Sequence, residues 1–546
     1  RRSIAPPMGS LASASAWLTE WTAGREWAVQ SFVALSSIAL LSVVLGQRLK
    51  GAAAAADTKA AANPDQAAAV RREFHSFQRS YLGVFVVVML ADWLQGTHMY
   101  TLYTKYQQEN ASVSVGALFF TGFLAAGLLG TFTGPFVDRY GRKRACLVYV
   151  ALELLINSLE HFNSMSLLLV GRVLGGVSTS LLFSAFEAWM VTEHRRRGFP
   201  EEWIGLTFGR CAVWNGATAI VAGVAAQLAA DWLGDIGPFQ LAMTLTALAG
   251  VLMLTWEENY GSAAPAAKAG KKAAQRRSDA PPSGLLGAWH VVWQSEELML
   301  VGLCYSLFEG AMYVFVFNWV PTLAAASGGF GAFAPVQGLL FSCLMAAISI
   351  GGELYNYAFG AAPVEAIGVA IYAAASVCMA LLVVCSCSDC GDLAFLVQFG
   401  ACLGFEVCVG AFQPCIATHR SRYVPDAQQS TVNNLFRLPL NMLVAVGTML
   451  SDHLPAHHIF AICAAAHALA TLCQLRLAWL GRQGGGGGGV AKASAQAAGP
   501  KKVRAASPKA RAASPKARAA TPRAPAGSPA RSSRDRRSPQ RQKKTL

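Results

Sequence analysis

Apolar runs recur along this chain, and each is long enough to cross a membrane as a helix. About 20 apolar residues span the roughly 30 Å of hydrocarbon in a bilayer. The runs lack the regular alternation of apolar and polar positions that a membrane barrel needs, so they predict helices. Thirteen runs meet this description: 28–46, 82–103, 113–133, 144–159, 164–192, 204–230, 238–256, 298–321, 335–352, 364–385, 393–418, 433–450 and 459–480.

The spacing of these runs predicts an all-α membrane protein built from two six-helix bundles plus one extra N-terminal transmembrane helix. We expect the extra helix to be an uncleaved signal anchor, and a removed targeting peptide is the alternative. The predicted parts are an N-terminal extension (1–27), the extra transmembrane helix (28–46), a linker (47–81), the first bundle (82–256), a cytoplasmic linker (257–297), the second bundle (298–480) and a disordered basic tail (481–546).

The composition agrees with a membrane location. Apolar residues make up 54% of the chain and charged residues only 14%, whereas a globular protein carries about 25% charged residues. The sequence contains no phosphate-binding glycine loop and no nucleophile elbow. It contains no metal-ligand spacing apart from one cluster of thiols. It therefore predicts a protein that is not an enzyme and that holds no cofactor or metal.

The thiol cluster leaves three interpretations open. Cys385, Cys387 and Cys390 lie in the stretch CSCSDC at the end of one apolar run. They could form a disulfide on an oxidising side, bind a soft metal, or have no chemical role. No matching cluster of His or Cys accompanies them, so metal binding is the weaker interpretation.

The net charge of +15 is carried by the C-terminal tail. Residues 481–546 contain 17 Lys or Arg and one acid, so the rest of the chain is close to neutral. The tail has no apolar face and is predicted to be disordered. Beside a membrane, such a strip favours contact with anionic lipid headgroups, and we expect no nucleic acid partner.

The positions of Lys and Arg predict the orientation. Loops on one side of the predicted bundles carry 14 basic residues, and loops on the other side carry only Lys105. Basic loops stay in the cytoplasm, so we expect the segment 257–297 and the tail to lie inside. The 14 residues are Arg139, Arg142, Lys143, Arg144, Arg195, Arg196, Arg197, Lys268, Lys271, Lys272, Arg276, Arg277, Arg420 and Arg422.

The turn after the run 113–133 carries the motif GPFVDRYGRKR (134–144). It resembles the signature loop of the major facilitator superfamily, where this loop stabilises the outward-open state. The resemblance implies the major facilitator fold, in which two bundles rock around a substrate site near the middle of the membrane. Asp138 and Arg142 are the candidate gating residues of this loop.

A narrower resemblance covers residues from about 80 to about 480. The segments look like those of the eukaryotic molybdate-anion transporters of that superfamily. This resemblance implies a secondary active transporter in the cell membrane that takes up molybdate by alternating access, and it transfers no set of substrate residues. Another oxyanion, an organic anion, or a membrane scaffold or sensor that transports nothing are the alternatives. The segments are ADWLQ, GRVLGGVSTSLLFSAFEAW, FPEEWIGLTFGR, WEENY, LFEGAMYVFVFNWVP and NLFRLPL.

Two charges in adjacent predicted helices lie at matching depth. Glu187 lies about five residues before the cytoplasmic end of its run, and Arg210 lies a comparable distance into the next run. An isolated charge in hydrocarbon costs at least about 2.5 kcal/mol, so we expect the two to form an ion pair. This pair is a candidate inner gate, and substrate binding by Arg210 is the second interpretation.

An internal repeat directs attention to Arg437. The segment AFEAW (185–189) is followed by Arg210 and Asn215, and AFQPC (411–415) is followed by Arg437 and Asn441. Arg437 has no acid at the position that corresponds to Glu187, and its fork of donors suits a tetrahedral oxyanion. Arg437, Arg210, Asn215 and Asn441 are therefore candidate substrate ligands, although Arg437 could instead extend to the membrane interface.

The first helix of each predicted bundle carries one acid near its middle. These acids are Asp92 in the first bundle and Glu309 in the second. A carboxylate there repels an anionic substrate unless it is protonated. Both are candidate proton-coupling residues. A structural hydrogen bond from a neutral carboxyl group is an equally good interpretation.

Overall fold

The computed structural model describes residues 19–54, 64–260, 285–359, 361–387, 393–424 and 429–483, some of them by their backbone alone. These residues all belong to the first of two units, Arg1–Ala491. Most of the predicted tail and most of the predicted cytoplasmic linker lie outside the described residues, as does Cys390.

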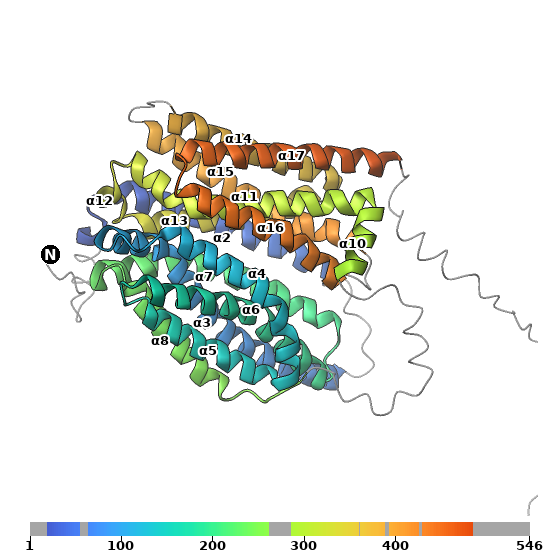
Figure 1. Ribbon diagram of the computed structural model, residues 1–546. Coiled ribbons are helices and arrows are strands. Elements are labelled where there is room, and N and C mark those ends of the chain that lie inside the picture. The colour runs from blue at the N-terminus through green and yellow to red at the C-terminus, as the bar shows by residue number, and fades with distance from the viewer. Residues whose placement is uncertain are drawn as a thin grey trace, which may run out of the picture. The chain divides into compact units, whose positions relative to one another are not determined.

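Each predicted run falls on a helix (Figure 1). Two short helices, α10 (Leu285–Gln294) and α12 (Phe330–Phe333), join them. The long helices are α2 (Glu26–Ala54), α3 (Pro64–Glu109), α4 (Val115–Tyr140), α5 (Arg142–Leu159), α6 (Met165–Arg196), α7 (Glu202–Leu233), α8 (Gly237–Met253), α11 (Glu296–Ala326), α13 (Gln337–Phe359), α14 (Val364–Cys387), α15 (Ala394–Tyr423), α16 (Gln429–Ser451) and α17 (Ala456–Gln483).

The helices pack as two bundles with the same internal arrangement. In the first, α3 packs on α7 and α8, and α6 packs on α4 and α5. In the second, the corresponding helix α11 packs on α16 and α17, and α15 packs on α13 and α14. The contacts between bundles repeat in the same way, because α4 meets α16 and α7 meets α13. A two-fold relation between the halves, inferred from a short sequence repeat, therefore extends to the packing of whole helices.

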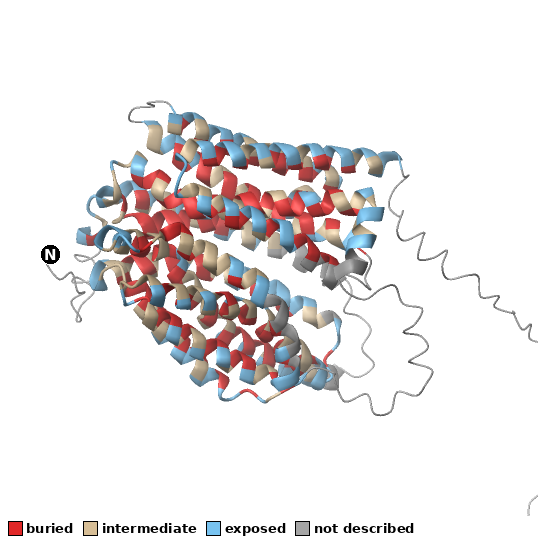
Figure 2. Cartoon of the chain, in the orientation of Figure 1, coloured by how far each residue is buried: buried red, intermediate tan, exposed pale blue. Residues whose placement is uncertain are grey.

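The exposed side chains identify the surface that faces lipid. Nine helices in the described part of the chain are long and apolar enough to cross a membrane. Figure 2 shows exposed positions along the ribbons of α14 and α17. Large apolar side chains that are exposed on these two helices include Val377, Leu381, Leu469 and Leu472. A continuous apolar face is unfavourable in contact with water. This face is therefore the lipid-facing surface of a membrane protein.

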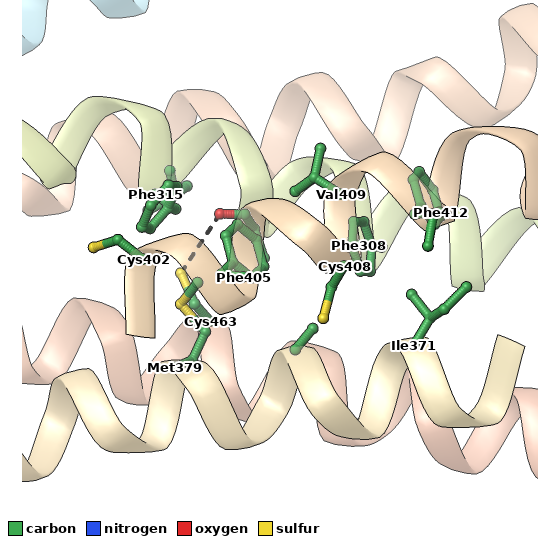
Figure 3. Packing of buried hydrophobic residues seen from close by; sticks show 14 of the residues in the cluster. Phe308, Phe315, Ile371, Met379, Cys402, Phe405, Cys408, Val409, Phe412 and Cys463 are labelled. Carbon is green, nitrogen blue, oxygen red and sulfur yellow. Dashed lines mark hydrogen bonds between the residues drawn. The ribbon is translucent and has the colours of Figure 1, made fainter. Parts of the chain in front are cut away.

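The core of the second bundle is built on stacked aromatic rings (Figure 3). Phe308 of α11 stacks on Phe412 of α15, with ring centroids 4.0 Å apart. Phe315 and Phe405 continue the stack one layer along, at 4.7 Å. Buried rings at these separations add stabilisation beyond their area, so α11 and α15 are held rigidly against each other.

The segment 47–81 is mostly helical, although the sequence predicted a linker there. Helix α3 begins at Pro64, well before the apolar run. The extension is polar overall, but Phe74 and Phe77 are buried, and Phe74 packs on Phe199 with ring centroids 5.5 Å apart. Tertiary contacts, and not hydropathy, fix this part of the helix.

We call the end of the bundles that carries residues 139–144, 195–197 and 420–422 the basic end. The other end is called the opposite end. Helix α2 runs along α13 and covers the predicted extra span. Its crossing of the membrane remains a prediction.

Candidate substrate site and gates

The close approach of α11 and α16 builds the candidate substrate site. Gly302 of α11 lies against the ring of Phe436, and a Cβ at Gly302 would collide with that ring. The Ser306 hydroxyl donates a hydrogen bond to the carbonyl of Phe436 at 2.9 Å. Small residues on α11 thus bring α16 close and place Arg437, the next residue, beside α11.

Arg437 meets a tyrosine and a glutamate on α11. Its guanidinium interacts with the Tyr305 hydroxyl and lies within electrostatic range of Glu309 and Tyr313. Tyr305 and Glu309 are four residues apart, so they share one face of the helix. Arg437 and Glu309, which the sequence identified separately as a candidate substrate ligand and a candidate proton-coupling residue, therefore lie within electrostatic range of each other but form no ion pair in the described part of the chain.

A second arginine lies at the same tyrosine. The guanidinium carbon of Arg420 lies over the Tyr305 ring, 5.2 Å from its centroid, in cation–π geometry. Arg420 also lies within electrostatic range of Glu309. Sequence analysis placed Arg420 in a cytoplasmic loop and did not identify Tyr305. Helix α15 continues to Tyr423, and only this extension points Arg420 at α11.

Glu309 has unused hydrogen-bonding capacity. Its Oε2 atom is buried and has no hydrogen-bond partner in the described part of the chain. A buried acceptor without a partner costs free energy, and such atoms concentrate at functional sites. Two guanidiniums therefore lie near Tyr305, Arg420 over its ring and Arg437 toward its hydroxyl, with one unsatisfied carboxyl group a helical turn away.

The predicted ion pair between Glu187 and Arg210 is absent. Arg210 donates a hydrogen bond to the side-chain carbonyl of Gln78, and Gln78 in turn donates to the Thr207 hydroxyl at 3.1 Å. Glu187 forms no ion pair or hydrogen bond within the described residues, and its side chain is exposed. The prediction was wrong because the N-terminal extension of α3, which carries Gln78, supplies the partner of Arg210.

The two candidate asparagines serve contacts between helices. Asn215 of α7 accepts a hydrogen bond from the indole of Trp93 on α3 at 3.0 Å. Asn441 of α16 lies against Gly127 of α4, where a Cβ would come within 2.6 Å of the Asn441 amide nitrogen. Asn441 therefore lies at a contact between bundles. Neither asparagine contacts Arg437 or Arg210 among the hydrogen bonds of the described residues.

Asp92 lies apart from Glu309, inside the first bundle. It lies within electrostatic range of Glu153, which accepts hydrogen bonds from Gln95 at 3.0 Å and from Ser178 at 2.5 Å. Glu153 was assigned no role from sequence. It lies at the centre of a buried polar network that joins α3, α5 and α6.

The signature loop forms a clamp at the basic end. Gly141 has a φ of +107°, a conformation that favours glycine. The Glu258 carboxylate accepts hydrogen bonds from the backbone amides of Lys143 and Arg144, at 2.8 and 3.1 Å, and so caps the start of α5. Arg142 donates to the carbonyl of Ala188 on α6 at 3.0 Å. The side chain of Asp138 is outside the described part of the structure.

The segment WEENY completes this clamp. The Trp189 indole of α6 stacks on Trp256, with ring centroids 3.8 Å apart, and donates to the carbonyl of Glu257 at 2.9 Å. The Arg196 guanidinium holds the pKa of the Glu257 carboxyl group below its usual value. The segments flagged by resemblance thus have a local structural role.

Among the residues that the structure describes, several hydrogen bonds join the bundles in the opposite half. The Gln337 side chain accepts from the Thr101 hydroxyl at 2.8 Å. The Gln227 side chain accepts from the Gly338 amide at 2.8 Å. Asp452 accepts from the backbone amide of Gly116 at 3.1 Å. At the basic end, in contrast, the side chains of Glu187, Arg210 and Arg437 are exposed.

A cavity of about 430 Å³ lies at the opposite end of the second bundle, between α11, α14, α15 and α16. Its lining includes Tyr100, Asn318 and Gln398, and none of its lining residues is charged. An uncharged cavity does not neutralise a buried anion. This cavity is therefore separate from the candidate site at Arg437. Cys385 lines this cavity, and no group of His, Cys, Asp or Glu suited to a metal occurs in the described ranges.

Solved structures share this fold. A D-xylose–proton symporter matches with a TM-score of 0.56 and 14% identity, over 73% of this chain and 97% of that chain. The nucleoside transporter NupG matches with a TM-score of 0.54 and 13% identity, over 73% and 98% of the two chains. The chain therefore has the fold of these structures, in which two related bundles of helices pack together, as predicted.

Sequence relatives narrow the family. Residues 48–405 match the MFS_5 family model, described as sugar transporters with 12 TM. The molybdate-anion transporter of Xenopus laevis is 33% identical over 74% of this chain and 86% of the relative. That of Danio rerio is 29% identical over 83% and 95%. The chain belongs to the molybdate-anion transporter family of the major facilitator superfamily.

Proposed function

We propose that this protein takes up molybdate across the cell membrane by alternating access, and that Arg437 binds the anion. The observation that carries the proposal is the position of Arg437 beside Tyr305, on a helix that lines the contact between the bundles. The names of the sequence relatives support molybdate as the substrate. A tetrahedral oxyanion accepts several hydrogen bonds at once, which the guanidinium fork and the tyrosine hydroxyl supply.

The basic end lies in the cytoplasm in this proposal. The positive charge of its loops supports that orientation. We propose that Arg437 and Arg210, whose side chains are exposed at the basic end, are reached by the anion from the cytoplasm when the basic end is open. Uptake then requires the opposite half to open and the basic end to close, and we propose that Arg142 and Asp138 of the signature loop act in that closure.

Glu309 couples transport to protons in this proposal. Its carboxyl group lies within electrostatic range of Arg437, so it competes with an incoming anion for the same positive charge. Protonation of Glu309 removes this competition, so the positive charge of Arg437 is available to the anion. Asp92 and its neighbour Glu153 form a second acidic site, in the first bundle, and we propose a supporting role there.

Molybdenum uptake by cells that express the protein tests this function. We expect saturable uptake that survives deletion of residues 481–546, and competition by excess sulfate measures the preference between the two dianions. Uptake no greater than in cells without the protein contradicts the proposal. Loss of uptake on removal of the tail alone favours the scaffold or sensor alternative. Equal inhibition by molybdate and sulfate indicates a general oxyanion transporter.

A further inference from the structure

The charges around Tyr305 specify the charge of the substrate. Two guanidiniums, of Arg420 and Arg437, approach this one side chain, one over the ring and one at the hydroxyl. Glu309, one helical turn away, lies within electrostatic range of both but, among the described residues, forms no ion pair with either. A buried ion needs opposite charge close by to offset the loss of its hydration. The number of positive charges in the site therefore limits the charge of the anion that it stabilises.

Neither arginine forms an ion pair with a carboxylate within the described residues. The ion pairs in that part of the chain include Arg422 with Glu365 at 3.1 Å, two residues from Arg420, but none that involves Arg420 or Arg437. Helix α15 thus carries two arginines with different roles. Arg422 is neutralised by α14, and Arg420 is directed at α11.

The groups that face Glu309 come from three helices. Helix α11 contributes Tyr305 and Tyr313, α15 contributes Arg420, and α16 contributes Arg437. From α17, His467 packs instead on the Phe308 ring at 4.8 Å. The charge balance of the site is therefore set by two arginines and one glutamate.

We propose that Arg420 is the second cation of a site for dianions, and that Glu309 is the internal anion that occupies the site when substrate is absent. With Glu309 ionised the three groups carry a net charge of +1. With Glu309 protonated they carry +2, which matches a tetrahedral dianion such as molybdate or sulfate. The proton stays on the carboxyl oxygen, and no covalent bond to the anion forms. The role of Glu309 in inward transport rests on the proposed function. The binding site for dianions does not.

Binding to the purified full-length protein tests the dianion site without transport. The readout is the rise in melting temperature with molybdate, with sulfate, and with perrhenate, a tetrahedral monoanion. We expect the dianions to stabilise the wild type more than perrhenate does. Arg420→Gln should weaken dianion binding by about tenfold and perrhenate binding by less. Arg422→Gln is the matched control, because it removes the same charge from the same helix turn, and it should leave the preference unchanged.

Reconstituted vesicles test the role of Glu309. Glu309→Gln should still exchange molybdate across the membrane, but an inward proton gradient should no longer drive accumulation. Its affinity should also stop depending on pH, an effect that a merely structural role does not produce. Arg420→Lys keeps the charge and serves as the fallback if Arg420→Gln does not fold, with dianion preference expected to persist.

The outcomes separate the two proposals. Stabilisation by sulfate but not molybdate, dependent on Arg420, contradicts the proposed substrate and leaves the dianion site standing. An unchanged preference in Arg420→Gln overturns the second cation. Gradient-driven accumulation by Glu309→Gln overturns the internal anion. A wild type that no dianion stabilises overturns the inference as a whole.

Discussion

Arg25 and Asp231 form an ion pair, with 2.7 Å between Arg25 Nη1 and Asp231 Oδ2. Arg25 directly precedes α2, and Asp231 lies near the end of α7 in the first bundle. Asp231 also accepts a hydrogen bond from the Trp21 indole at 2.8 Å. Helix α2 packs on α13 of the second bundle. Its residue Trp27 contacts Phe395 of α15, which also belongs to the second bundle. The leading segment therefore connects the two bundles at the opposite end.

Asp231→Asn should lower the stability of the protein by about 1–3 kcal/mol, because it removes a charge-assisted bond and leaves Arg25 half-buried without its counterion. Thermal unfolding in detergent measures this. Asp235→Asn is the control, since its pair with Lys105 is more exposed and should contribute less than about 1 kcal/mol. Equal effects of the two substitutions contradict a clasp at Asp231.

Glu258→Gln should destabilise the basic end by about 1–2 kcal/mol, because the carboxylate caps two backbone amides at the start of α5. Glu257→Gln is its neighbouring control, since that carboxylate forms only an exposed pair with Arg196. Hydrogen exchange of the α5 amides distinguishes them. Faster exchange should appear in Glu258→Gln alone, and unchanged exchange there refutes the cap.

Arg210 should be coupled energetically to Gln78 and not to Glu187. In double-mutant cycles of stability, Glu187→Gln and Arg210→Gln should add, within about 0.5 kcal/mol. Gln78→Ala and Arg210→Gln should not add, because they share one hydrogen bond. A large coupling between Glu187 and Arg210 restores the ion pair that the sequence suggested.

The fold was predictable because hydropathy and charge report directly on a bilayer. Each apolar run became a helix, and Val377 and Leu472 show the lipid-facing surface that the runs require. The site was predictable only in part. Arg437 and Glu309 were identified as isolated charges in apolar runs, but no local pattern says that they face each other.

The errors share one physical cause. Hydropathy ends a helix where polar residues begin, but α3 and α15 continue beyond the apolar runs because their polar ends pack on other helices. Gln78 lies in one such extension and Arg420 in the other. Because the extension of α3 was not predicted, Arg210 was assigned the wrong partner. Because the extension of α15 was not predicted, Arg420 was not identified as a cation of the candidate site. Aromatic residues such as Phe74 and Phe77, spaced for one helix face, were the available signal.

Orientation has its own test. An epitope tag placed within residues 261–284 should stain only after cells are permeabilised, because the basic end is expected to lie in the cytoplasm. A tag before residue 19 should stain intact cells if α2 crosses the membrane. Staining of intact cells by the first tag contradicts the predicted orientation. The absence of staining by the second tag indicates that α2 does not cross the membrane.

Molybdate uptake by Arg437→Gln, at matched surface expression, tests the central claim most directly. Arg437→Lys keeps the charge but loses the fork of donors, so its apparent affinity should fall about tenfold, equivalent to about 1.4 kcal/mol. Arg437→Gln removes the charge and should abolish nearly all uptake. Normal molybdate affinity in a well-expressed Arg437→Gln variant contradicts the account, because the anion is then bound elsewhere.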